Sequence, residues 1–234
     1  MGSCFFHPRE THLALGIMNA HPDFAGQGVA RALLAEIITR AGERPVRLVS
    51  STMNLDSYSL YTRAGFVPRE LYQDMFVPSE KPRPKAPVGA ERVRAATPND
   101  VASMVALEEE VSGIRRAKDY RFFVENEQGV WRVFVIDGEN GMEGFLVSID
   151  HPGSNMLGPG VMRSDEAALA LIHAQLGAMP ERQPVFLVPA RAEKLVAGLY
   201  AWGARNCELH VAQVRGEAKE FGGITMPTFM PETG

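Results

Sequence analysis

A loop with two glycines joins an apolar run to an amphipathic helix near the start of the chain, and this arrangement can bind an anion. The run Thr11–Ala20 is apolar enough for a buried strand and ends at His21-Pro22, where proline interrupts the hydrogen bonding of a strand. Residues 29–41 then place apolar side chains on one helical face, and Gly42 is suited to end that helix. Unpaired amides at the start of a helix, together with the helix dipole, favour negative charge, so a phosphate is the predicted ligand.

The glycines of this loop, Gly26 and Gly28, can serve a ligand or only a turn. Glycine lets the backbone approach a phosphate closely and adopts φ values that other residues resist, but a tight turn without a ligand uses glycine for the same reason. Two familiar phosphate loops are excluded. A dinucleotide fingerprint needs glycine where Arg31 stands, and a P-loop needs a Gly-Lys-Ser/Thr run that this sequence lacks.

The stretch from Met18 to Leu34 resembles motif A of the GNAT superfamily of N-acetyltransferases. In that family a strand ends in proline, and a Gln/Arg-x-x-Gly-x-Gly/Ala loop cups the pyrophosphate of coenzyme A. Ala25 departs from the usual Gln or Arg, which is expected to weaken binding while leaving the backbone cradle in place. The resemblance implies that acetyl-CoA contacts Met18, Ala20, Ala25, Gly26, Gln27, Gly28, Val29 and Ala30.

A second stretch resembles motif B of the same superfamily. Residues 46–50 read as a strand, Asn54 as a helix cap, and Leu60-Tyr61 followed by Ala64-Gly65-Phe66 as the end of that helix. The resemblance implies that Asn54 contacts the pantetheine arm of coenzyme A and that Tyr61 protonates the departing thiolate as general acid. A core role for Tyr61 stays open, because tyrosine on an apolar helix face is often core and Tyr200 holds the same position in the second part of the chain.

The resemblance implies direct transfer of an acetyl group from acetyl-CoA to an amine, with no covalent enzyme intermediate and no metal. The acceptor would be a small-molecule or protein amine, and amides of Ile17–Ala20 would stabilise the oxyanion. Glu10, His12 and His21 lie near the predicted strand as candidate general bases, although each is more simply a surface or turn residue. The run Glu108–Glu110 is most simply a solvated helix face.

The chain divides at residues 78–90, where four prolines among charged residues predict a semi-rigid linker. Residues 1–77 and 91–234 look like copies of one another. The pattern His-Pro, seven residues, then Gly-Ile/Val-Met starts at His7 and again at His151, and Leu-Val followed by Leu-Tyr starts at Leu48 and again at Leu187. We therefore predict an α/β fold (α+β in some schemes) with two tandem GNAT-like mixed sheets flanked by helices.

The two copies differ in ways that bear on function. The first has ten residues from Asn19 to Gly28 where the second has only Arg163–Ala167, so coenzyme A is expected to bind in the first copy alone. The second copy is expected to shape the acceptor pocket, to complete the first sheet or to form a pseudo-dimer, with residues 185–188 as its central strand. Its segments 156–162 and 224–231 are similar to the YitH-type domain at the end of some tandem GNAT proteins.

The first copy is predicted to be incomplete. Residues 92–142 of the second copy, which read as two strands and two helices, have no counterpart before Met1, so about 50 residues are expected to be missing upstream. Three functions stay open: an active N-acetyltransferase, a non-catalytic acyl-CoA-binding or regulatory protein, and a shortened form of an active enzyme. An unpaired first strand would leave an exposed edge, and a homodimer through that edge is expected.

Composition narrows the class of protein. The net charge of −4 and the isoelectric point near 5.9 argue against a broad nucleic-acid-binding surface. Cys4 and Cys207 form neither a disulfide framework nor a metal-binding spacing, which favours a reducing, cytoplasmic location. No apolar run approaches the ~20 residues of a membrane helix, so no membrane association is expected.

Overall fold

The structure, a computed structural model, describes residues 1–80 and 84–234. Residues 81–83 of the predicted linker lie outside the described residues. The helices are α1 (Val29–Ala41), α2 (Leu55–Arg63), α3 (Val101–Ser112), α4 (Ala117–Glu125), α5 (Asp165–Ala178) and α6 (Glu193–Ala201). The strands are β1 (Gly2–Pro8), β2 (Leu13–Ala20), β3 (Val46–Ser51), β4 (Val67–Phe76), β5 (Val93–Ala95), β6 (Trp131–Gly138), β7 (Gly141–His151), β8 (Ser154–Met162), β9 (Phe186–Pro189), β10 (Arg205–Arg215) and β11 (Ile224–Met226).

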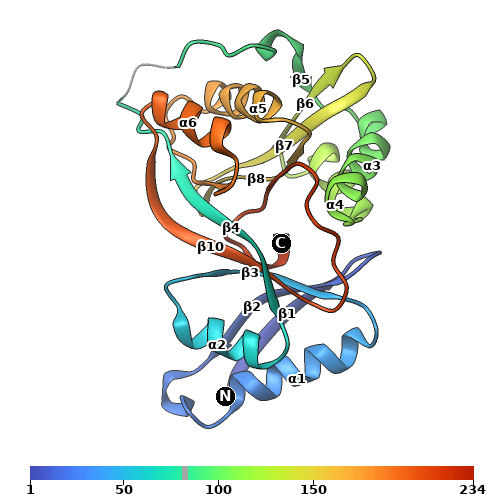
Figure 1. Ribbon diagram of the computed structural model, residues 1–234, viewed down its shortest axis with the longest axis vertical. Coiled ribbons are helices and arrows are strands. Elements are labelled where there is room, and N and C mark those ends of the chain that lie inside the picture. The colour runs from blue at the N-terminus through green and yellow to red at the C-terminus, as the bar shows by residue number, and fades with distance from the viewer. Residues whose placement is uncertain (81–83) are drawn as a thin grey trace.

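A six-stranded sheet in the order β1-β2-β3-β10-β4-β9 carries helices α1 and α2 on one face (Figure 1). The apolar stripe predicted for the first helix packs there, because Leu34 and Ile37 of α1 contact the buried side chains of β2 and β3. Alternate residues of β3 divide between the two faces. Val46 and Leu48 face the helices, whereas Val49 belongs to a separate apolar cluster on the opposite face.

The second part of the chain completes the sheet of the first, which is one of the roles predicted for it. Strand β10 lies between β3 and β4 and pairs antiparallel with both, and β4 in turn pairs with β9. Figure 1 shows the long strands β4 and β10 running together from the lower sheet into the upper part of the molecule. The six-stranded sheet contains strands from before and after residues 78–90. The division of the chain into two repeats at these residues therefore stays a prediction.

A five-stranded sheet in the order β11-β8-β7-β6-β5 forms the rest of the molecule. Helices α5 and α6 share an apolar cluster with one face of it, and α3 and α4 share a cluster with the other (Figure 1). The chain therefore has two sheets flanked by helices, as predicted. Only the six-stranded sheet is mixed, because all strand pairs within the five-stranded sheet are antiparallel. No helix in the described part of the chain is long and apolar enough to cross a membrane.

Two expectations about the second part were wrong. Strand β9 is not central but ends the six-stranded sheet, and a single parallel bridge, Met156–Val185, joins it to β8. The reason is that β11 pairs with β8 in the place where β9 would continue. The run Glu108–Glu110 is not uniformly solvated either, because the Glu108 side chain is 1% exposed and binds the buried guanidinium of Arg116.

Strand β1 lies at the outer end of the six-stranded sheet and pairs antiparallel with β2. Its side chains include Phe5, which is 60% exposed, so the strand presents both an unpaired backbone edge and an apolar residue. Such an edge is a template for pairing with another chain. Dimerisation through β1 stays a prediction.

Candidate functional site

The glycine loop forms an open helix N-terminus. Gly28 is the N-cap of α1 at φ +81°, Gly26 has φ +76°, and no side chain caps the helix. The first helical hydrogen bond runs from the Ala32 amide to the Gly28 carbonyl at 2.9 Å, so the amides of residues 29–31 precede it. These donors and the positive end of the helix dipole face one direction, which makes the loop suited to a phosphate.

A cavity of about 660 Å³ lies between this loop, α1 and α2. Its lining includes six of the nine residues predicted to bind coenzyme A: Ala20, Ala25, Gly26, Gly28, Val29 and Ala30. Arg31 and Arg63 also line it and can neutralise phosphate charge, while Asp56 is a carboxylate at its α2 side. The volume falls in the range of small-molecule sites, roughly 300–1,000 Å³.

The other three predicted binding residues lie outside this lining. Asn54 caps α2, because its Oδ1 accepts a hydrogen bond from the Ser57 amide at 3.0 Å. Gln27 donates from Nε2 to the Asp23 carbonyl at 3.2 Å, and Met18 packs its side chain against the core under α1. The helix cap is as the sequence predicted. Contact of these residues with coenzyme A stays a prediction.

Strands β2 and β3 separate immediately beyond the start of their pairing. They pair in parallel at only two positions, Leu13 with Val46 and Ala14 with Arg47, although β2 continues to Ala20. No backbone hydrogen bond joins the remaining part of β2 to β3 among the described residues. The edge of β2 that leads to the glycine loop therefore has no backbone partner on β3 and can bind an extended ligand by backbone hydrogen bonds. Residues 231–233 lie against both strands.

Tyr61, on α2, belongs to the apolar cluster between the helices and the sheet, and it does not line the cavity beside the glycine loop. Its side chain is 8% exposed, and its ring packs against Phe66 with the ring centroids 5.8 Å apart. Burial, reinforced by Cys4, raises the pKa of Tyr61, so the hydroxyl keeps the proton that an acid must donate. Tyr200, which the predicted repeat aligns with Tyr61, is instead 48% exposed, and its hydroxyl is within donating distance of Gln73 and Asn206. The two tyrosines thus have different environments.

The helix α5, which the predicted repeat aligns with α1, lacks an equivalent open site in the part of the chain that the structure describes. Ser164 caps α5 by accepting a hydrogen bond from the Ala167 amide at 3.2 Å, and the first turn contains Asp165 and Glu166. These carboxylates repel phosphate. Strand β11 also occupies the edge of β8 that corresponds to the free edge of β2.

The three candidate bases named from the sequence have other roles. Glu10 accepts a hydrogen bond from the Ala117 amide at 3.0 Å, and His21 accepts one from the Asp23 amide at 3.3 Å. His12 is 1% exposed, and burial, reinforced by Arg47 and other arginines, lowers its pKa to about 2. None of the three lines the cavity beside the glycine loop.

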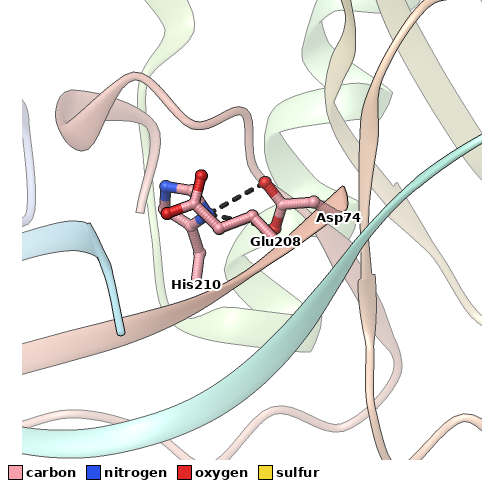
Figure 2. Close-up of side chains that lie close together, drawn as sticks. All are labelled: Asp74, Glu208 and His210. Atoms are coloured by element: carbon pink, nitrogen blue, oxygen red, sulfur yellow. Dashed lines mark hydrogen bonds and ion pairs between the residues drawn. The ribbon is translucent and has the colours of Figure 1, made fainter. Parts of the chain in front are cut away.

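A cluster of acid–base side chains that the sequence did not reveal lies on the face of the sheet opposite α1 and α2. Figure 2 shows Asp74 of β4 beside Glu208 and His210 of β10, with the His210 ring directed at the Asp74 carboxylate. His210 Nδ1 lies 3.0 Å from Oδ1 and 2.9 Å from Oδ2 of Asp74, and both side chains are buried. Ser51, at the end of β3, donates its hydroxyl hydrogen bond to Glu208.

This cluster can move a proton or hold a cation. Asp74, bound at Nδ1, orients the imidazole of His210 and leaves Nε2 as the proton acceptor, a common arrangement of a histidine base. The ligand atoms of Asp74, Glu208 and His210 also lie within 4.8 Å of one another, close enough to ligate one metal ion. The hydrogen bond between His210 and Asp74 favours the first role.

Comparison with known proteins agrees with this geometry. Residues 1–66 match the sequence profile of the Acetyltransferase (GNAT) family. A comparison with curated proteins found no match. The match covers the glycine loop, the diverging strands and the helix that carries Tyr61.

Solved structures resemble nearly the whole chain. A protein of Pyrococcus horikoshii assigned as an acetyltransferase has a TM-score of 0.72 at 15% identity, over 99% of this chain and 73% of that one. A GCN5-related N-acetyltransferase from Sphaerobacter thermophilus has a TM-score of 0.59 at 16% identity, covering 95% and 78%. A tandem GNAT protein from the clavulanic acid biosynthesis pathway has a TM-score of 0.55 at 14% identity, covering 91% and 78%. At these identities the likeness establishes the fold, and the YitH-type resemblance stays a prediction.

Proposed function

We propose that this chain, whose residues 1–66 match the profile of the Acetyltransferase (GNAT) family, transfers an acetyl group from acetyl-CoA to an amine. The glycine loop at the start of α1, joined to a strand pair that opens beyond Ala14, carries the proposal. The amides of residues 29–31 bind the pyrophosphate, and Arg31 and Arg63 neutralise its charge. The free edge of β2 holds the pantetheine arm by backbone hydrogen bonds and presents the thioester in the opening.

Transfer at this site uses the two faces of the sheet for different steps. The amine nitrogen attacks the thioester carbonyl, and backbone amides of β2 stabilise the oxyanion. Tyr61, on the α2 side, gives its proton to the departing thiolate. His210, on the opposite face, takes the proton that the amine loses, with Asp74 holding its ring. The acid and the base are thereby kept apart, so they do not neutralise each other.

Calorimetric titration of acetyl-CoA, followed by thiol release with a panel of amines, tests the proposal. Tyr61→Phe separates an enzyme from a binding protein, because it keeps the buried ring and removes a hydroxyl that bonds no described residue. Acetyl-CoA affinity is expected to stay unchanged, while thiol release falls about 100-fold, as for loss of a general acid. Tyr200→Phe is the matched control and leaves both unchanged. Failure of the folded protein to bind acetyl-CoA would refute the proposal, and binding without thiol release would favour the regulatory alternative.

His210→Asn is expected to lower thiol release about 100-fold with acetyl-CoA affinity unchanged, because asparagine keeps a hydrogen bond to Asp74 but cannot accept the proton. His151→Asn, at an exposed turn of the second part, is the control. A metal role predicts another result: chelation would abolish wild-type activity and a divalent cation would restore it. That result would rule out His210 as the base.

A further inference from the structure

A second cavity, of about 760 Å³, lies at the opposite end of β2 and β3 from the glycine loop. It is bounded by the start of those strands, the residue after α3, and the loop that follows β10. None of its lining residues belongs to the cavity beside the glycine loop. The polar side chains that line it are Thr11, His12, Arg47, Arg69, Glu217 and Lys219.

Arg47 is the buried member of this set. Its side chain leaves β3 on the face opposite α1, because its neighbours Val46 and Leu48 both face the helix. The residue is 4% exposed, and its Nε and Nη2 atoms are buried without a hydrogen-bond partner among the described residues. The guanidinium lies 5.7 Å from the ring centroid of Phe221, which supplies a cation–π contact but no acceptor.

No carboxylate neutralises Arg47 within the described residues. Glu108 is the carboxylate whose charge acts on it most, but that carboxylate is bound by Arg116 through Nε and Nη2. Burial lowers the pKa of Arg47 to about 10, so the group remains charged at neutral pH. A buried charge without a partner is costly, and groups with pKa values perturbed in this way cluster at functional sites.

The groups around Arg47 leave its buried nitrogen atoms unbonded, and most of the charge near it is positive. His12 has Nδ1 3.2 Å from the Thr11 hydroxyl oxygen, and its Nε2 is buried without a partner among the described residues. Arg69 and Lys219 add positive charge at the exposed rim, where Lys219 also bonds the Glu110 carbonyl. Glu217, exposed on the loop after β10, is the carboxylate of the lining.

We infer that this cavity binds the anionic group, a carboxylate or a phosphate, of a small molecule, with Arg47 as its buried anchor. A guanidinium offers parallel N–H donors that match two oxygens of either group. Arg47 pairs with Ala14 at the last position before β2 and β3 separate. The site therefore adjoins the opening in which the thioester is placed. Residues 16–18 of β2 lie about 7–13 Å further along the strand, at ~3.3 Å per residue.

This distance suits one small molecule that reaches from Arg47 into the opening. The ligand is then the acceptor: an amine that carries a carboxylate or a phosphate. This identification rests on the proposed function, whereas the presence of an anion site does not. The two parts can be tested separately because anion binding needs no acetyl-CoA.

Titration of inorganic phosphate and of acetate, at constant ionic strength and without coenzyme A, tests the site. Saturable binding is expected to weaken at least about tenfold in Arg47→Met, the size of a lost charged hydrogen bond. Arg47→Lys keeps the positive charge but loses the parallel N–H donors of the guanidinium. Its affinity for the anion should lie between those of the wild type and Arg47→Met. Arg205→Met, at the exposed far end of β10, should bind as the wild type does. The phosphate and acetate arms show which of the two anions the cavity prefers.

Two further measurements distinguish an anion site at Arg47 from phosphate binding at the glycine loop and from a structural role of Arg47. Because the glycine loop can also bind phosphate, the titration is repeated in Gly28→Asp, where phosphate binding is expected to persist. If Gly28→Asp loses phosphate binding while Arg47→Met keeps it, the inference is overturned. The melting temperature of Arg47→Met is expected to stay level or rise, since an unpaired charge is removed. A fall of about 10 °C would mean that Arg47 supports the fold instead, which also overturns the inference.

Activity then identifies the ligand as the acceptor. Amines that carry a carboxylate or phosphate should release thiol from acetyl-CoA with a lower KM than neutral amines of the same size, and Arg47→Met should remove that advantage. Absence of saturable anion binding would refute the site while leaving acetyl-CoA binding, and with it the proposed function, intact. Anion binding without acetyl-CoA binding would leave the site and refute the proposed function.

Discussion

Gly28→Asp is expected to weaken acetyl-CoA binding at least about 100-fold, which corresponds to roughly 3 kcal/mol. Gly28 has φ +81° and is the N-cap of the helix whose free amides face the proposed pyrophosphate site. A side chain at this φ strains the backbone by about 1–3 kcal/mol and displaces the amides that follow it. The added carboxylate also places negative charge beside the pyrophosphate. Calorimetric titration measures the change directly.

Gly42→Asp is the matched control for this prediction. Gly42 ends the same helix at φ +61°, and, as at Gly28, an added Cβ would meet no atom within 4 Å. The two variants therefore share a positive φ and the added charge but differ in which end of α1 they alter. Backbone strain at Gly42 is no smaller than at Gly28, because its ψ of −122° lies outside the left-handed helical region that Gly28 adopts at ψ 9°. Gly42→Asp should bind acetyl-CoA within about threefold of the wild type. Equal losses in both variants would mean that helix stability, and not a phosphate site, explains the effect.

The local features of the candidate site could be predicted because their signals are contiguous in the sequence. The helix over residues 29–41, its termini at Gly28 and Gly42, and the Asn54 cap each depend on a few neighbouring residues. Their φ values and hydrogen bonds follow from the residue types themselves. The same is true of the turn at His21, whose ring bonds a backbone amide two residues on.

The features that depend on distant pairing could not be predicted in this way. His210 and Asp74 are 136 residues apart and meet only because β10 inserts between β3 and β4. Each residue alone reads as an ordinary polar position on a strand. Arg47 carried a signal that sequence reasoning can use: it is a charged residue within the otherwise apolar start of β3, flanked by residues that must be buried. Only the structure shows that the buried Nε and Nη2 atoms of Arg47 have no hydrogen-bond partner among the described residues.

Glu108 shows how a charge pattern misleads. Three consecutive glutamates are typical of a solvated helix face, and Glu109 and Glu110 do form exposed ion pairs with Arg115 and Arg163. Glu108 points inward instead, since helical residues one apart lie about 100° around the axis. Its partner, Arg116, lies eight residues further along the chain, beyond the end of α3, and its side chain binds the Glu108 carboxylate.

Arg116→Met is expected to destabilise the protein by about 3–5 kcal/mol, because it leaves the Glu108 carboxylate buried and unpaired. The two side chains are 5% and 1% exposed, and Arg116 binds both Glu108 oxygens through Nε at 3.0 and 3.1 Å. Burial opposes the charge of Arg116, but Glu108, together with Tyr120 and Asp119, outweighs burial and raises the pKa of the guanidinium. Urea unfolding of the variant measures the loss as a lower midpoint at an unchanged slope.

The double variant Glu108→Gln/Arg116→Met removes both charges and should recover most of this loss, whereas Glu108→Gln alone should not. Full additivity of the two single changes would contradict a coupled buried pair. Arg116 also donates from Nη1 to the Thr233 carbonyl at 3.3 Å, and residues 231–233 pack against β2 and β3. Acetyl-CoA affinity should nevertheless stay within about threefold in the folded single variants, because the glycine loop depends on α1 and not on this contact. A parallel loss of stability and of acetyl-CoA affinity would instead show that the buried pair holds the opening between the strands in its binding shape.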